Sequence, residues 1–279
     1  FRRSRGLGDV YKRQDSEALS AQYQYTMDLN TSFTGDDNLY VRLRTGNGDG
    51  TPFGSTTYGA YLSSNSSKYS DNLAVDKIWY TFPVGESNTV WVGPKIENYY
   101  MHATAPSIYK PTLKQFALGG NGAAYGASTK AGAGWAYKAD NGFAVSSNVV
   151  SANTGIATNE SVTSWATQVG YTQPQYSASL MINQKFNGWE DGYYSTTKGH
   201  YRLLDGATST QQSANSVNYG LRAWWRPVDT GTATPSISAG YDTSTIDITN
   251  KALDTTNAWF VGLNWSDICL LYTSDAADE

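Results

Sequence analysis

From residue 216 to residue 242, apolar and polar side chains alternate with a period of two. The first arm places polar or small residues such as Arg222 between apolar ones at every second position, namely Val217, Tyr219, Leu221, Ala223 and Trp225. Successive side chains of a β-strand point to opposite faces, so this period predicts a hairpin with one apolar and one polar face. The same alternation recurs at 38–45, 76–82, 89–97 and 258–265. The pattern predicts an all-β fold and raises the question of what each face contacts.

The two ends of the chain do not share this pattern. The head contains "SRGLGDVYKRQ" and the tail reads "CLLYTSDAADE". Both can be translated from one inverted DNA element that resembles the transposon end of sequencing-library adapters. We therefore interpret residues 1–14 and 269–279 as adapter-derived and exclude them from reasoning about the fold. The rest, 15–268, is interpreted as a fragment of a longer gene product.

The composition of this central part excludes several classes of protein. The two ends hold five of the 20 Lys and Arg residues and four of the 24 Asp and Glu residues, which leaves 15 against 20. An acidic chain without a basic run argues against nucleic acid as a partner. The single cysteine, Cys269, lies in the tail, so no disulfide framework is expected. A chain with 21 Tyr and 9 Trp and no run of about 18 apolar residues fits either an outer-membrane barrel or a secreted β-sandwich adhesin or carbohydrate-binding module.

The predicted connections between strands come in two sizes that alternate. Short turns are predicted at 35–38, 85–88, 139–142, 172–175 and 228–235, and long polar stretches at 46–72, 98–124, 151–161, 187–215 and 243–256. A transmembrane barrel has short turns at one end and long loops at the other, whereas the crossovers of a sandwich give no reason for this sorting. We therefore predict a transmembrane antiparallel β-barrel, of which 15–268 supplies eleven to thirteen strands.

In such a barrel the apolar face contacts lipid and the polar face contacts water. The residues predicted to face lipid are Leu39, Val41, Leu43, Ile78, Val90, Val92, Val217, Leu221, Val261 and Leu263. Aromatic side chains cluster beside the short turns, where a membrane–water interface would lie. The predicted interface aromatics are Tyr80, Phe82, Tyr171, Tyr176 and Trp225.

Four segments resemble the porins of cyanobacterial outer membranes. They read "LNTSFTGDDNLYVRLRTGN", "IWYTFPVGESNTVWVGPKIE", "LRAWWRPVDTGTATPSISAGYDTS" and "AWFVGLNWSD". These porins belong to the OprB-like, carbohydrate-selective family, some members of which are labelled iron uptake porins. The resemblance implies an integral outer-membrane barrel of about sixteen strands, a homotrimer, and passive diffusion of inorganic ions or sugars. It also implies a peptidoglycan-binding domain N-terminal to the barrel, which this chain does not contain.

Charged residues on the polar face are candidates for the pore lining. The predicted set is Arg42, Arg44, Lys95, Glu97, Arg222 and Arg226. Two interpretations are open: a ring of cations that favours anions, or cations paired with carboxylates such as Glu97 and Asp242. The Tyr-rich loop 97–122 likewise has two interpretations, an inward-folded constriction or an exposed surface loop.

The sequence predicts no enzyme, cofactor or metal. His102 and His200 are the only histidines and both fall in predicted loops. No nucleophile elbow, metal-ligand spacing or phosphate-binding loop is present. The glycine-rich stretch 126–134 leads into a strand, whereas a nucleotide-binding loop leads into a helix.

Overall fold

The computed structural model describes residues 23–47, 71–109, 118–120, 122–126, 129–152, 156–187, 215–229, 234–247 and 255–265. The ends that we interpret as adapter-derived, and His200, lie outside these residues. Among the described residues, no helix combines the length and the apolar character needed to cross a membrane.

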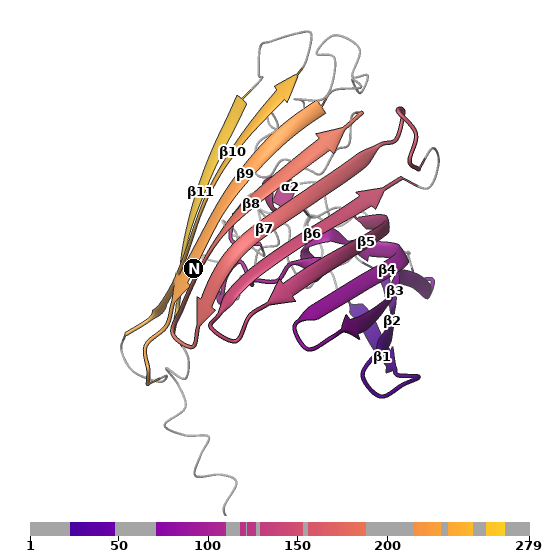
Figure 1. Cartoon of the computed structure of the whole chain (residues 1–279), viewed down its shortest axis with the longest axis horizontal. Coiled ribbons are helices and arrows are strands. Elements are labelled where there is room, and N and C mark those ends of the chain that lie inside the picture. Colours follow the sequence, from indigo (N-terminus) through magenta and orange to yellow (C-terminus); the bar gives the residue numbers. More distant parts are fainter. Residues whose placement is uncertain are drawn as a thin grey trace, which may run out of the picture.

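In the part of the chain that the structure describes, eleven strands form one antiparallel sheet, and each strand pairs with its neighbour in the sequence (Figure 1). They are β1 (Gln24–Thr31), β2 (Asn38–Gly46), β3 (Ala74–Val84), β4 (Asn88–Glu97), β5 (Thr129–Lys138), β6 (Phe143–Ser151), β7 (Thr163–Gln173), β8 (Tyr176–Phe186), β9 (Asn215–Trp225), β10 (Ser236–Asp247) and β11 (Thr255–Asn264). A short 3₁₀-helix, η1 (Asn98–Met101), and a single helical turn, α2 (Gly122–Tyr125), lie between β4 and β5. The predicted all-β antiparallel fold and the strand number are confirmed.

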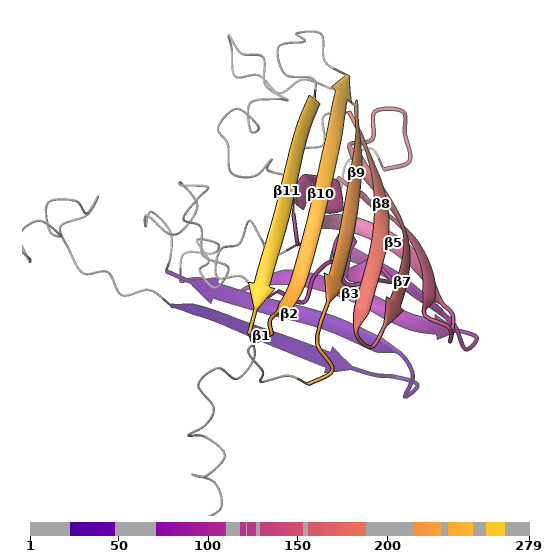
Figure 2. The same cartoon turned by 90° about the vertical axis from the view of Figure 1, so that its left-hand side faces the viewer.

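The sheet is strongly curved, and η1 and α2 lie on its concave side (Figure 2). The connections β1–β2, β3–β4, β5–β6 and β7–β8 are short, and β2–β3, β4–β5, β6–β7 and β8–β9 are longer. The last two connections depart from this order, because β9–β10 spans 226–235 whereas β10–β11 spans only 248–254. Because successive strands run in opposite directions, the first four short connections lie at one end of the sheet, as the sequence predicted. The prediction of a long stretch at 243–256 is wrong, since residues 243–247 belong to β10 and residues 255–256 to β11. Within the described residues, β1 pairs only with β2, and β11 pairs only with β10.

The two faces of the sheet are inverted relative to a water-soluble sheet. On β6 to β10 the concave face consists largely of buried polar side chains, among them Ser146, Gln168 and Asn218. The opposite face carries exposed apolar side chains, and Leu221 and Val261 are 52% and 58% exposed. We call these the polar face and the apolar face. Residues in register across antiparallel strands share a face. Leu221, for example, lies opposite Leu180 on β8 and Tyr241 on β10.

A register shift in β4 breaks the strict alternation. The pairing with β5 jumps between Gly93 and Ile96, and Pro94 lies in the gap. Proline has no N–H to donate, so within sheets it occurs at edges or bulges. After the shift Ile96 is completely buried in a cluster on the polar-face side, and Lys95 falls opposite Ile78 on the apolar side. The structure therefore differs from the strict alternation that assigned Lys95 to the polar face.

A second shift lies between β2 and β3. Arg42 pairs with Lys77 but Leu43 pairs with Val75, so Asp76 is an extra residue in β3. Such a bulge turns two consecutive side chains toward the same region. Asp76 and Lys77 are accordingly both buried.

The β1–β2 turn is organised by one carboxylate. Asp37 accepts hydrogen bonds from the Ser32 hydroxyl (2.6 Å) and from the backbone N–H groups of Phe33 (2.9 Å) and Thr34 (2.8 Å), and its second oxygen accepts one from the Tyr80 hydroxyl. These bonds, the Ser32 hydroxyl first, hold the pKa of Asp37 well below its usual range.

Replacement of Asp37 by alanine is expected to lower the melting temperature of the protein in detergent micelles at neutral pH. A carboxylate whose pKa is lowered by folding stabilises the folded state above its unfolded pKa of about 3.9, and this contribution is lost as the pH falls below that value. The difference between wild type and variant should therefore shrink below about pH 4. Asp36→Ala, at the exposed neighbouring position, is the control. An equal loss in both variants, or a pH-independent difference, would contradict the assignment.

Candidate functional site: the polar face and the segment that covers it

The described residues of the connection between β4 and β5 fold back onto the polar face (Figure 2). Its described residues are 98–109, 118–120 and 122–126, and we call them the inner segment. Of the two interpretations of this stretch, the structure therefore has the inward arrangement.

Backbone groups of the inner segment are hydrogen-bonded to side chains of the sheet. The donors and acceptors are Ala103 N–H to Ser146 Oγ (3.1 Å), Thr104 N–H to Gln168 Oε1 (2.9 Å), and the N–H groups of Ile108 and Tyr109 to Ser238 Oγ (3.1 and 3.2 Å). A buried backbone N–H without a partner costs free energy, and an irregular segment cannot satisfy these groups internally. The serines and the glutamine of the polar face supply the missing acceptors.

Two apolar clusters lie under the inner segment. Met101 at the end of η1 packs with Tyr40, Trp79, Ile96 and Val150. Farther along the segment, Tyr125 packs with Ala166 and Met181. The polar face thus includes small apolar patches where the helical parts of the inner segment rest.

His102 joins the two helical parts of the inner segment to the sheet. Its Nε2 donates to the Tyr125 carbonyl oxygen (2.9 Å), and its Nδ1 accepts from Asn148 Nδ2 (3.0 Å). Asn148 Oδ1 in turn accepts from Asn98 Nδ2 (2.7 Å). Burial lowers the pKa of His102 to about 4 and outweighs the opposing effect of the bond to Tyr125. At neutral pH the ring is therefore an uncharged structural link.

Arg222 lies on the polar face of β9, beneath the inner segment. Its guanidinium donates to both oxygens of Asp242 (2.7 and 3.1 Å), and Nε donates to the Leu118 carbonyl oxygen (2.9 Å). The guanidinium carbon lies 5.1 Å from the centre of the Tyr125 ring. The side chains of Arg222 and Asp242 are 0% and 1% exposed, so this pair is buried and holds the inner segment at Leu118.

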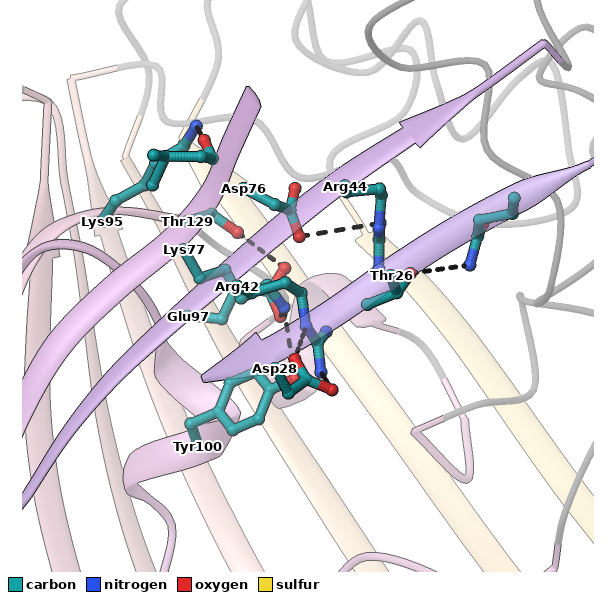
Figure 3. A network of polar contacts seen from close by, with 12 residues as sticks. Thr26, Asp28, Arg42, Arg44, Asp76, Lys77, Lys95, Glu97, Tyr100 and Thr129 are labelled. Carbon is teal, nitrogen blue, oxygen red and sulfur yellow. Dashed lines mark hydrogen bonds and ion pairs between the residues drawn. The ribbon is translucent and has the colours of Figure 1, made fainter. Parts of the chain in front are cut away.

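A second set of charged groups lies on β1 to β4 (Figure 3). Arg42 Nε donates to Asp28 Oδ1 (2.6 Å), and this oxygen also accepts from the Tyr40 hydroxyl (2.5 Å). On β3, Lys77 Nζ lies 2.5 Å from Glu97 Oε2.

The same region contains further partners. Arg44 Nη1 lies 3.7 Å from Asp76 Oδ2 on the neighbouring strand. Glu97 Oε1 accepts from the Thr129 hydroxyl (2.7 Å), and Lys77 donates to the Tyr100 hydroxyl (3.3 Å). Every charge in this network therefore has an opposite charge within 4 Å.

The six residues predicted to line a pore fall into two groups: four that form ion pairs and two that do not lie with them. Arg42, Arg44, Glu97 and Arg222 each take part in an ion pair with a group on a neighbouring strand. This is the paired arrangement of the two that the sequence left open.

The other two predicted residues lie elsewhere. Lys95 follows the bulge of β4 and donates to the Val75 carbonyl oxygen (2.7 Å). Arg226 follows the end of β9, is exposed, and donates to the Pro174 carbonyl oxygen (2.5 Å) in the β7–β8 turn. The prediction that Lys95 lines the polar face is therefore wrong, since the bulge turns it to the apolar side opposite Ile78, and Arg226 lies beyond the end of its strand.

The residues predicted to face lipid share the apolar face of the sheet. Register connects Val41 to Ile78 across β2 and β3, and Leu263 to Ile237 across β10 and β11. The exposed or half-exposed members are Leu39, Val41, Leu43, Ile78, Val90, Val92, Val217, Leu221, Val261 and Leu263. Their contact with lipid stays a prediction.

The predicted interface aromatics gather at the short-turn ends of the strands. Tyr171 and Tyr176 have ring centres 6.3 Å apart, and Tyr176 is in register with Trp225. Tyr80 and Phe82, with ring centres 5.7 Å apart, precede the β3–β4 turn. These rings lie on the apolar face, and three of them, Tyr171, Tyr176 and Trp225, are more than 40% exposed.

Sequence reasoning missed the carboxylates that pair with the cations. Asp28 and Asp76 are not in the predicted set because their partners are on other strands, and pairing depends on register. The alternation on 24–31 alone does not show which residue of β2 lies opposite Asp28. The register, which pairs Asp28 with Arg42, is needed for that. Within the described part of the chain, no group of three or more His, Cys, Asp or Glu residues is arranged to hold a metal ion.

Comparison with known proteins gives little. No protein-family model and no curated protein matches the chain. Among solved structures, the chain is similar to the outer membrane channel DcaP of Acinetobacter baumannii, with 12% identity and a TM-score of 0.37. The matched region covers 80% of this chain and 66% of that channel, so the chain spans about two thirds of its length. The function must therefore be argued from the residues themselves.

Asp242→Asn is expected to lower the free energy of unfolding in detergent by about 3–5 kcal/mol, since it leaves the buried Arg222 cation without its counter-charge. Replacement of both partners by apolar residues (Arg222→Met with Asp242→Leu) removes the unpaired charge and should recover part of this loss. Urea unfolding followed by tryptophan fluorescence measures both. A double variant that is less stable than Asp242→Asn would contradict the role of the charge pair.

Proposed function

We propose that this chain belongs to an integral β-barrel of a bacterial outer membrane, which forms a water-filled channel for passive diffusion of small solutes. The observation that carries the proposal is the inverted sheet. Large apolar side chains stay exposed on β1 and β3 to β11, while serine, asparagine, glutamine and charged side chains occupy the concave face. In water a continuous apolar surface of this size would drive association. In a bilayer the acyl chains would solvate it, and the polar face would enclose water.

The proposal requires that the sheet closes. Backbone groups within a bilayer must all be paired, so an open edge is not tolerated there. Among the described strands β1 and β11 each have one free edge. We therefore propose that further strands of the complete protein join β1 to β11. The resemblance to cyanobacterial OprB-like porins suggests about sixteen strands, a homotrimer, and a separate peptidoglycan-binding domain.

The charges of the polar face bear on the solute. Arg42, Arg44, Lys77 and Arg222 are paired with carboxylates in the described residues, so they do not form a ring of uncompensated positive charge. We propose a channel of weak charge selectivity that passes small inorganic ions, and sugars as the family resemblance suggests. We propose no catalytic role, since His102 is fully engaged as a structural link.

The complete protein is expected to form water-filled pores in planar lipid bilayers. The current through single channels should be proportional to voltage. The reversal potential in a KCl gradient should be small because Arg42, Arg44, Lys77 and Arg222 are paired with carboxylates. Stable insertion without any conductance would contradict the proposal, and a large reversal potential would contradict the weak selectivity.

Leu221→Arg is expected to destabilise the protein in bilayers by about 2–4 kcal/mol, the cost of a cation near the midplane of the lipid-facing surface. Leu221 lies near the middle of the membrane-spanning length proposed for β9. Val228→Arg, at a 78% exposed position in the β9–β10 turn, should cost far less. Unfolding in lipid vesicles compares the two. If the alternative, a soluble β-sandwich adhesin or carbohydrate-binding module, were correct, the protein would fold without detergent and would not need a bilayer.

A further inference from the structure

Glycines of the sheet lie directly beneath the inner segment. On β5, a Cβ at Gly134 would lie 2.6 Å from Met101 Sδ and 3.0 Å from Met101 Cβ. On β7, a Cβ at Gly170 would lie 2.2 Å from Thr104 Oγ1 and 2.8 Å from Thr104 Cβ. Real Cβ atoms essentially never come within 3.0 Å of another heavy atom, so a larger residue would require the contacting side chain, the segment or the strand to shift.

The same relation continues on the last two strands. A Cβ at Gly240 on β10 would lie 1.9 Å from the carbonyl oxygen of Gly119, and one at Gly262 on β11 would lie 2.6 Å from the Tyr109 ring. We call Gly134, Gly170, Gly240 and Gly262 the glycine track. None of the four has a positive φ, so the backbone conformation does not require glycine. What requires it is the close approach of another segment.

The glycine track and the polar side chains beside it form one contact surface for the inner segment. Gly170 is two residues from Gln168, which accepts from the Thr104 N–H, and Gly240 is two residues from both Ser238 and Asp242. The hydrogen bonds from Gln168 and Ser238 to the backbone of the inner segment therefore lie next to glycines, whose lack of a side chain lets the segment approach. At Gly240 the close contact is with a backbone carbonyl oxygen of the segment, and at Gly134, Gly170 and Gly262 it is with the side chains of Met101, Thr104 and Tyr109.

We propose that the glycine track sets how closely the inner segment lies against the sheet and thereby sets the free cross-section of the channel. The inner segment is a fixed constriction, and the four glycines are positioning residues for it. This inference rests on the proposed channel function. It adds that the size limit for solutes depends on residues that themselves do not line the open passage.

The test uses Gly170→Ala and Gly240→Ala in the complete protein. Each new methyl group pushes the inner segment away from the sheet and toward the lumen. Single-channel conductance in KCl should therefore fall, and the largest polyethylene glycol that enters the pore should become smaller. Conductance and size limit equal to wild type in both folded variants would overturn the proposal.

A compensating substitution distinguishes a steric effect from general damage. Thr104→Gly removes all three atoms that a methyl group at residue 170 would meet, and keeps the backbone N–H that bonds to Gln168. Gly170→Ala with Thr104→Gly should return to wild-type conductance. Gly240→Ala with Thr104→Gly should not, because the methyl group at residue 240 meets the backbone of Gly119. Failure of the first pair to recover, or recovery of the second, would overturn the proposal.

Gly132→Ala is the matched control. A Cβ there would meet the Val149 carbonyl oxygen (2.6 Å) and the side chains of Ile96 and Val150 (both 3.0 Å), and none of these atoms belongs to the inner segment. This variant should lose stability and keep the conductance of its folded fraction. A conductance loss equal to that of Gly170→Ala would count against the track.

Ser238→Ala adds no atom, so it tests the contact between the sheet and the inner segment even if the glycine variants do not fold. It removes the acceptor of the Ile108 and Tyr109 N–H groups, and the distribution of single-channel conductances should broaden. A distribution identical to wild type would overturn the proposal. Absence of channels in the wild-type protein would instead contradict the channel function itself, so the two failures are distinguishable.

Discussion

The hydrogen bonds between eleven neighbouring strands fix which side chains share a face, and the rest of the structure depends on this register. Once β8, β9 and β10 are paired, Leu180, Leu221 and Tyr241 must lie side by side on the apolar face. Arg222 and Asp242 come together on the polar face by the same pairing, although their register partners are Gly240 and Gly220. A slip of one residue would exchange the two faces completely.

In an inverted sheet, the hydrogen-bonding groups of the polar face need partners on the concave side. The inner segment does this in the described part of the chain. Its backbone N–H groups find acceptors on Ser146, Gln168 and Ser238, and its Leu118 carbonyl oxygen accepts from Arg222. The small residues of the polar face therefore have two complementary tasks: the serines bind the segment, and the glycines make room for it. Glycine is depleted in strands in general. On this sheet, glycine and serine occur where the inner segment packs as a second layer.

The sequence predicted the parts of this arrangement that depend on local periodicity. On β9 the alternation from Val217 to Trp225 predicted both faces, and the order of short and long connections predicted the meander. It did not predict the side on which Lys95 lies, because the bulge at Pro94 shifts the pairing there. Nor could it predict the partners of the inner segment. Ile108 and Ser238 are 130 residues apart. They meet only because the sheet is curved and the inner segment lies on its concave side.

The central claim is that the apolar face contacts acyl chains. Single-tryptophan variants of the complete protein in vesicles test it directly, with brominated lipids as quenchers from the membrane and iodide as a quencher from water. Trp259 is 77% exposed on the apolar face of β11, and Trp79 is 5% exposed on the polar-face side of β3. The account predicts that brominated acyl chains strongly quench Trp259, that iodide does not, and that Trp79 is insensitive to the lipid. Quenching of Trp259 by iodide with no response to brominated lipid would contradict it.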